Sequence, residues 1–249
     1  MQSMDSLSTL ASWIGESSSI VFFGGAGTST ESGIPDFRSA AGLYLTEKSS
    51  PYPPEQMLSH SFFISKPEVF FDFYRSKMLH PGAEPNGAHK LLARLEHEGR
   101  LSAIVTQNID GLHQKAGSTR VLELHGSVHR NHCMKCSRPY GLETILESAE
   151  TVPHCPVCGG VIKPDVVLYE EELDRRVLTD SIQALSSADL LIIGGTSLTV
   201  QPAASLTAYF RGRHAVMLNA EPTAYDSRAD LIITDRIGHV FERVGELLA

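Results

Sequence analysis

The sequence predicts an α/β fold, with a Rossmann-like parallel sheet covered by helices on both faces, a small zinc-binding module and a helical insertion. Short apolar stretches alternate with helical patterns along most of the chain, which is typical of a parallel sheet with crossover helices. The first stretch, 19–23, ends on the glycine-rich turn 24–27, as in the first βα unit of dinucleotide-binding folds. Four cysteines stand in two close pairs, a pattern typical of metal binding.

Apolar spacing predicts the regular elements in order along the chain. We expect helices where apolar residues recur every three or four positions, and buried strands where β-branched and aliphatic residues follow one another. The predicted helices are 7–15, 88–98, 173–186, 202–210 and 240–248, and the predicted strands are 19–23, 101–106, 121–124, 189–193, 215–219 and 231–234.

Two segments interrupt this alternation. Residues 40–87 carry prolines at 51, 53, 54, 67, 81 and 85 together with aromatic pairs, which predicts helices and loops inserted into the framework. The cysteine module occupies 127–165. We expect the single domain, 1–249, to consist of a small lobe made by these two segments and a large lobe made by about 1–39, 88–126 and 166–249.

Length and composition fit one globular enzyme-sized domain. The chain has 249 residues, of which 42% are hydrophobic and 20% charged. Its formal charge of −8 disfavours nucleic acid as a partner and suits basic partners such as a lysine-rich protein tail. No run approaches 18 apolar residues, and the first residues lack a secretory signal pattern. We therefore expect a cytoplasmic monomer that does not enter a membrane.

The glycine loop predicts phosphate binding without hydride chemistry. Gly25, Ala26 and Gly27 follow an apolar strand, so the backbone can approach a pyrophosphate with N–H groups aimed at it. The dehydrogenase fingerprint requires a further glycine where this chain has Thr30, and no convincing acidic residue closes a second strand. A simple tight turn is the alternative interpretation of such a loop.

The four cysteines predict one structural zinc ion. Cys133, Cys136, Cys155 and Cys158 follow the spacing C-x2-C-x18-C-x2-C, in which each pair offers two thiolates from one turn. Four thiolates leave no open position for water, so the metal would stabilise the fold and take no part in catalysis. The alternatives are a histidine, His132 or His154, in place of one cysteine, and a pair of redox dithiols.

Four separate segments resemble the sirtuin family in its bacterial, single-domain form. They are GAGTSTESGIPDFR at 25–38, TQNIDGLH at 106–113, LHG at 124–126 and GTSL at 195–198, and the resemblance extends from about residue 15 to 245. Sirtuins cleave NAD to nicotinamide and transfer the acyl group of an acyl-lysine to ADP-ribose. The resemblance implies an NAD-dependent protein-lysine deacetylase that forms O-acetyl-ADP-ribose and acts on acyl-lysine proteins or peptides.

The resemblance also implies roles for individual residues. Asn108 and Asp110 suit the nicotinamide carboxamide, which donates and accepts hydrogen bonds, although a polar turn is the alternative. His125 suits the general base, because the ordinary histidine pKa is about 6.5, although a structural histidine is the alternative. Phe37 would exclude water from the ribose, and Arg38 would orient the cofactor. The implied cofactor-binding residues are Gly25, Ala26, Gly27, Thr30, Phe37, Arg38, Gln107, Asn108, Ile109, Asp110, His125, Gly195, Thr196, Ser197, Asn219 and Ile237, and the implied substrate strand contains Val166, Val167 and Leu168.

Some residues depart from the family pattern. Gly24 replaces a frequent threonine, Thr28 a branched apolar residue, and Tyr169 with Glu170 a frequent Phe-Gly pair. The tyrosine and arginine, three positions apart, that accompany succinyl or malonyl preference are absent from 40–80, which favours acetyl or longer apolar acyl groups.

Three other functions remain as alternatives at this point. A mono-ADP-ribosyltransferase or NAD hydrolase would use the same pocket with another acceptor. A zinc-ribbon binding module would have no catalytic activity, and a Rossmann dehydrogenase would require the missing glycine.

Overall fold

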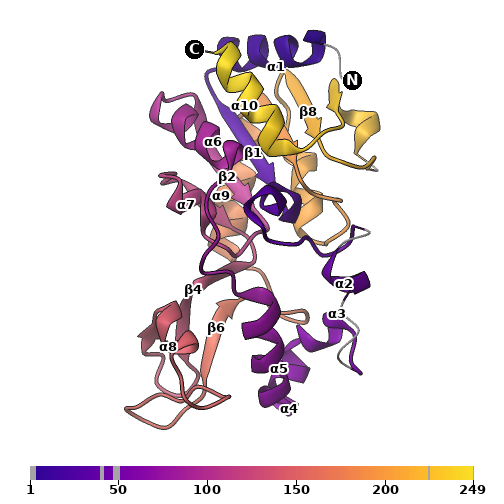
Figure 1. Cartoon of the computed structure of the whole chain (residues 1–249). Coiled ribbons are helices and arrows are strands. Elements are labelled where there is room, and N and C mark those ends of the chain that lie inside the picture. The colour runs from indigo at the N-terminus through magenta and orange to yellow at the C-terminus, as the bar shows by residue number, and fades with distance from the viewer. Residues whose placement is uncertain (1–3, 40–41, 47–50, 224, 249) are drawn as a thin grey trace.

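A six-stranded parallel sheet forms the centre of the larger part of the molecule (Figure 1). The computed structural model describes residues 4–39, 42–46, 51–223 and 225–248, so positions 40–41 and 47–50 of the predicted insertion lie outside the described residues. The strands are β1 (Ile20–Gly24), β2 (Leu101–Thr106), β3 (Val121–Glu123), β7 (Leu190–Gly194), β8 (His214–Leu218) and β9 (Leu231–Ile233). All six predicted strands are thus confirmed.

The strand order is β3-β2-β1-β7-β8-β9, and every neighbouring pair is parallel. The direction of strand succession therefore reverses between β1 and β7. In open α/β sheets, ligands bind outside the carboxyl ends of the strands at such a reversal.

Helices cover both faces of this sheet, because alternate residues of each strand point to opposite sides. In β1, Ile20 and Phe22 pack with α1 (Met4–Glu16), α6 (Gly87–His97) and α10 (Ile237–Leu247). Val21 and Phe23 pack on the other side, with α9 (Arg175–Ser187) and the 3₁₀ helix η4 (Ala203–Tyr209). The five predicted helices are found at these places.

The predicted helix 202–210 is 3₁₀-helical rather than α-helical. The hydroxyls of Ser205 and Thr207 donate to the carbonyls of Pro202 and Ala204, three residues earlier. Such local side-chain bonds compete with regular α-helical hydrogen bonding, and the apolar period alone did not reveal them.

The inserted segments form a second body with its own core. An antiparallel sheet, in the order β5-β4-β6, lies beside a set of short helices (Figure 1). Aromatic side chains of the helices share one apolar cluster with Cys133 and Ile162 of the sheet. The elements are β4 (Gly126–Cys133), β5 (Pro139–Tyr140), α8 (Leu142–Leu146), β6 (Ile162–Val166), α2 (Leu43–Thr46), α3 (Pro54–Met57), α4 (His60–Ser65), α5 (Pro67–Phe73) and a π-helical turn, Tyr74–Met78.

Short elements complete the fold: η1 (Ala26–Thr28), η2 (Thr30–Ser32), α7 (Leu112–Lys115) and η5 (Asp226–Arg228).

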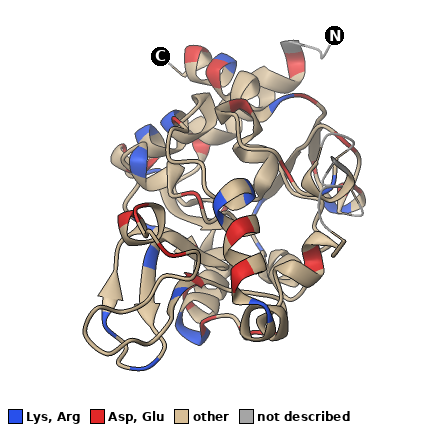
Figure 2. Cartoon of the chain, turned by 60° about the horizontal axis from the view of Figure 1, so that its bottom comes forward, with Lys and Arg blue, Asp and Glu red and all other residues tan. Residues whose placement is uncertain are grey.

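No helix within the described ranges is both long and apolar enough to cross a membrane. Basic and acidic residues are interspersed along the ribbon in the view of Figure 2.

Candidate functional site

A cavity of about 800 Å³ opens at the carboxyl ends of the parallel strands and extends to β6 and the inserted helices. Every predicted cofactor residue except Gly25 lines it, as does the predicted substrate segment. The lining residues in question are Ala26, Gly27, Thr30, Phe37, Arg38, Gln107, Asn108, Ile109, Asp110, His125, Val166, Val167, Leu168, Gly195, Thr196, Ser197, Asn219 and Ile237. The structure therefore brings together segments that lie far apart in the sequence.

Glycines allow the loop after β1 to lie in close contact with the loop after β7. Gly25 N–H donates to the Gly194 carbonyl at 3.1 Å, and Gly27 N–H donates to the Gly195 carbonyl at 2.8 Å. A Cβ atom on Gly27 would lie 2.7 Å from the Gly195 Cα, and Gly195 itself has φ +61°. These two N–H groups bond across the loops, so the expectation that they point at a phosphate was wrong for them.

Asn108 and Asp110 belong to a polar cluster that also contains Ser29. The Ser29 hydroxyl donates to Asp110 Oδ2 at 2.7 Å, and Asn108 Nδ2 donates to the Ser29 oxygen at 3.1 Å. Asp110 Oδ1 accepts from the Leu112 N–H at 2.8 Å, at the start of α7. Asp110 thus shapes a polar turn and also lines the cavity, and its contact with the nicotinamide carboxamide stays a prediction.

Ser29 is a residue that sequence reasoning missed. It is 1% exposed and joins the glycine loop to the turn after β2. The signal was its position inside the segment 25–38, but nothing local pairs it with a carboxylate 81 residues away.

His125 lies just beyond β3 with one ring nitrogen fixed. Its Nδ1 is 3.0 Å from the Gln107 carbonyl oxygen, which can only accept, so Nδ1 carries the proton and Nε2 is left as a base. Burial lowers the pKa of His125, and the bond to Gln107 opposes that shift. The ring is therefore neutral near pH 7 and available to accept a proton.

The loop that carries Phe37 and Arg38 folds back on itself. Asp36 Oδ1 accepts from the backbone N–H groups of Arg38 and Ser39, at 3.0 and 2.8 Å. The Phe37 ring meets Tyr44 edge-on, with 5.5 Å between the centroids. These contacts place Phe37 and Arg38 at the cavity wall.

Asn219 and Ile237 also line the cavity. Asn219 follows β8, and its side-chain amide donates to the Glu221 carbonyl at 2.9 Å. Ile237 is 4% exposed and is the first residue of α10. Glu31, in the glycine loop, accepts from the Gly238 N–H, so the loop and the start of α10 are held together.

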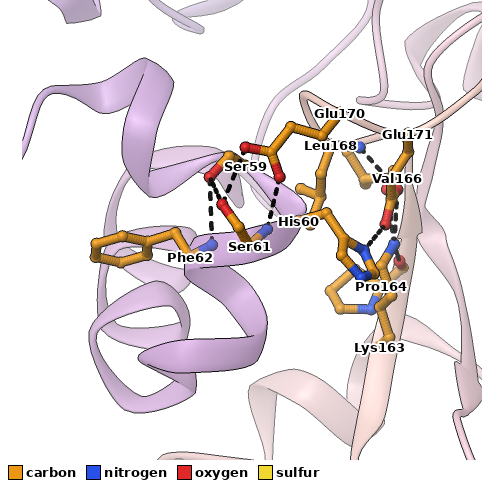
Figure 3. A network of polar contacts seen from close by, with 10 residues as sticks. All are labelled: Ser59, His60, Ser61, Phe62, Lys163, Pro164, Val166, Leu168, Glu170 and Glu171. Carbon is orange, nitrogen blue, oxygen red and sulfur yellow. Dashed lines mark hydrogen bonds and ion pairs between the residues drawn. The ribbon is translucent and has the colours of Figure 1, made fainter.

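The predicted substrate segment lies along one side of the cavity. Val167 N–H donates to the His125 carbonyl at 2.9 Å, and Leu168 N–H donates to Glu171 Oε2 at 2.9 Å. The ammonium of Lys163, 8% exposed, lies 3.1 Å from the same Glu171 oxygen (Figure 3). Because the N–H groups of Val167 and Leu168 are already bonded, a substrate strand would have to pair with other backbone groups of this segment.

The four cysteine thiols converge at one point. All four Sγ atoms lie within 4.8 Å of one another, with Cys133 to Cys158 at 3.4 Å and Cys136 to Cys155 at 3.8 Å. A tetrahedral zinc ion with Zn–S bonds of about 2.3 Å requires sulfur separations of about 3.8 Å. The donor set fits zinc, and the cysteines are not paired as disulfides.

Neither adjacent histidine joins this cluster in the described part of the chain. His154 instead lies 2.7 Å from a Glu150 carboxylate oxygen. The prediction of a four-cysteine metal site is therefore confirmed in its geometry.

Two buried histidines lie beside the turn that carries Asp110. His89 of α6 and His113 of α7 are at most 1% exposed, with ring centroids 4.7 Å apart. Burial lowers the pKa of His89 to about 4, although the charge of Asp110 opposes this. Burial lowers the pKa of His113 to about 3, with a further contribution from His89. Neither ring nitrogen of His113 has a hydrogen-bond partner among the described residues.

Acid should destabilise the fold through these histidines. The unfolded chain takes up their protons near pH 6.5, but the folded chain does so only near the lowered pKa values, so stability falls as pH drops. For His113 the loss between about pH 6.5 and 4.5 is about 2 kcal/mol. His113→Phe removes the titrating ring without breaking a hydrogen bond. Over the same pH range, the free energy of unfolding in urea should therefore fall by about 2 kcal/mol less in this variant than in the wild type. Equal pH slopes for the two proteins would contradict this prediction.

Known proteins resemble the chain along almost its whole length. The family model described as Sir2 family matches residues 25–202. A protein of Clostridium acetobutylicum named NAD-dependent protein deacetylase is 57% identical over 241 residues, covering 97% of this chain and 98% of that protein. A protein of the same name from Cutibacterium acnes is 58% identical over 235 residues, covering 94% and 96%.

Solved structures of Sir2 proteins have the same fold. One, a complex of a Sir2 variant with a deacetylated p53 peptide and 3'-O-acetyl ADP ribose, has a TM-score of 0.88 and 37% identity, covering 97% of this chain and 98% of that one. A second, of Sir2 with a p53 peptide and NAD+, has a TM-score of 0.84 and 38% identity, covering 97% and 98%. The family model, the relatives and these structures agree: the chain belongs to the Sir2 family.

Proposed function

We propose that this chain is an NAD-dependent protein-lysine deacetylase, which releases nicotinamide and transfers the acetyl group of acetyl-lysine to ADP-ribose. The observation that carries the proposal is the arrangement of one cavity. It contains the unprotonated Nε2 side of His125, the Ser29–Asn108–Asp110 cluster and the glycine loops, at the reversal point of a parallel sheet. The names and complexes of the relatives support the same activity.

The polar cluster suits the nicotinamide end of NAD. A carboxamide offers both a donor and an acceptor, and Asn108 and Asp110 provide the complementary groups. Bound NAD would supply the ribose carbon that accepts the acetyl oxygen when nicotinamide leaves. Ser29 fixes the Asp110 carboxylate and the Asn108 amide, so the cluster is oriented before the ligand arrives.

The remaining groups have roles that follow from their positions. His125 accepts a ribose hydroxyl proton at Nε2, while Nδ1 stays bonded to Gln107. Phe37 covers the reacting region and excludes water, and Arg38 orients the phosphates. The Gly195–Ser197 loop, Asn219 and Ile237 hold the rest of the dinucleotide, and 166–168 lies beside the acyl-lysine.

Zinc would be held by the four cysteines, outside the cavity lining. It would stabilise the small lobe, which is made by 40–87 and 127–165. The large lobe is made by 1–39, 88–126 and 166–249. We further propose that the enzyme is a cytoplasmic monomer, that it acts on proteins rather than nucleic acids, and that it accepts acetyl-lysine rather than succinyl- or malonyl-lysine.

Nicotinamide release should depend on an acetylated peptide. We expect release from NAD to be at least about 10-fold faster with an acetyl-lysine peptide than with the same peptide unacetylated, because catalysis requires the acyl oxygen in place. Chromatography should find nicotinamide, deacetylated peptide and O-acetyl-ADP-ribose in equal amounts. Release at the same rate without the acetylated peptide would contradict the proposal and indicate an NAD hydrolase or a mono-ADP-ribosyltransferase.

A further inference from the structure

Tyr169 makes a contact that a phenylalanine in its place could not make. Its hydroxyl lies 2.8 Å from the hydroxyl of Tyr44, which is 125 positions earlier in the chain. Tyr169 directly follows the cavity-lining segment 166–168, whereas Tyr44 belongs to α2, at the end of the loop that carries Phe37 and Arg38. One hydrogen bond therefore joins the substrate side of the cavity to the cofactor side.

Tyr44 is in turn bound to that loop by three contacts. Its N–H donates to the Phe37 carbonyl at 2.9 Å. Its ring meets Phe37 edge-on at 5.5 Å and lies 5.2 Å from the guanidinium carbon of Arg38. The position of the Tyr44 ring thus determines where Phe37 and Arg38 lie in the cavity wall.

The backbone of Tyr169 is bonded to Leu58 and to His60, the first residue of α4. Tyr169 N–H donates to the Leu58 carbonyl at 2.9 Å, and the His60 N–H donates to the Tyr169 carbonyl at 3.0 Å. Both of its main-chain polar groups are therefore bonded to the helical insertion, which leaves the side chain as its adjustable part.

The two glutamates that follow reinforce this anchor (Figure 3). Glu170 has φ +78°, a left-handed conformation that favours glycine, yet its carboxylate accepts from the Ser61 N–H and hydroxyl at 2.8 and 2.9 Å. Glu171 lies 2.7 Å from His60 Nδ1 and 3.1 Å from Lys163 Nζ. The segment Tyr169–Glu171 is thus bonded on both sides, so the backbone that carries the Tyr169 side chain has a defined position.

We propose that Tyr169 is a positioning residue, whose hydroxyl bond to Tyr44 holds the loop of Phe37 and Arg38 in its NAD-binding form before NAD arrives. The inference rests on the proposed function of this cavity. A loop ordered in advance loses less conformational entropy on binding, so the hydroxyl pair raises the affinity for NAD. Both hydroxyls are required for the bond, so removing either one should have the same effect as removing both.

NAD binding to Tyr169→Phe, Tyr44→Phe and the double variant tests this inference. By calorimetry without peptide, we expect the Kd for NAD to rise about 2- to 10-fold in each single variant, the range expected from loss of one hydrogen bond. The double variant should be no weaker than the singles. In peptide-dependent turnover the KM for NAD should rise by the same factor, while kcat changes less. Tyr209→Phe, an exposed tyrosine outside the cavity lining, is the matched control.

Amide hydrogen exchange in the ligand-free protein supplies a second readout. The Leu43 and Tyr44 N–H groups, which bond to the Asp36 and Phe37 carbonyls, should exchange faster in both single variants. Unchanged Kd and exchange in Tyr169→Phe, or additive losses in the double variant, would overturn the inference. A wild-type protein that binds no NAD would instead contradict the proposed function.

Discussion

Replacing His125 by alanine is expected to lower the rate of deacetylation about 10²- to 10⁴-fold, the usual contribution of a general base. Of the two nitrogens of the His125 ring, only Nε2 remains free to take a proton, because Nδ1 is bonded to the Gln107 carbonyl. The alanine removes that base and leaves the Ser29–Asn108–Asp110 cluster and both glycine loops unchanged. Turnover should therefore fall far more than NAD binding, which calorimetry can measure on the same protein.

The pH profile gives an independent check on the same histidine. Burial lowers the pKa of His125, so the ring stays unprotonated at neutral pH and becomes protonated only below the ordinary histidine range. In the wild type, kcat/KM should fall as pH drops below the ordinary histidine range, because the pKa of His125 is lowered, and the residual activity of His125→Ala should lack that limb. His239→Ala, an exposed histidine of α10, is the control. Deacetylation within about threefold of wild type in His125→Ala would exclude it as the base.

The framework of the fold could be predicted from sequence because its signals are local. The four central strands of the parallel sheet, β1, β2, β7 and β8, are largely buried on both faces, so each contains a short apolar run such as 190–194. Strand ends then identify cavity residues, since the carboxyl ends of parallel strands share one edge. That reasoning, with the family resemblance, placed Asn108, His125 and Asn219 around one cavity, and their binding roles stay predictions.

The contacts that sequence reasoning missed join residues that are far apart in the chain. Ser29 with Asp110, Tyr44 with Tyr169, and His89 beside His113 are each defined by tertiary packing. No periodicity distinguishes a histidine buried without a partner from an exposed one. The prediction for the glycine loop was wrong for a different reason. The N–H groups of Gly25 and Gly27 donate to carbonyls of the neighbouring loop, and the local sequence pattern contains no sign of those partners.

Removing the metal site is expected to unfold the small lobe and abolish deacetylation, although no cysteine lines the cavity. Cys133 and Cys155 are buried in the same apolar cluster as the aromatic side chains of α4 and α5 and as Val166 at the cavity edge. Structural zinc contributes about 10–16 kcal/mol in isolated zinc-finger peptides, which equals or exceeds the total stability of most domains. Loss of the ion therefore removes the support of that whole cluster.

Cys133→Ala is the sharpest test of this coupling. The purified wild type should contain one zinc ion per chain and the variant should contain little, as measured by atomic emission. Limited proteolysis should cut the variant within 127–165, and its deacetylation should fall below about 1% of wild type because β6 and the helical insertion lose their shared core. Met134→Ala changes an exposed residue between two of the cysteines and should keep both metal and activity. Three thiolates cannot close a tetrahedral site, so the variant should lose the ion. If the metal-free Cys133→Ala protein were nevertheless folded and fully active, the fold would not depend on a metal, and the four thiols would not hold a structural ion.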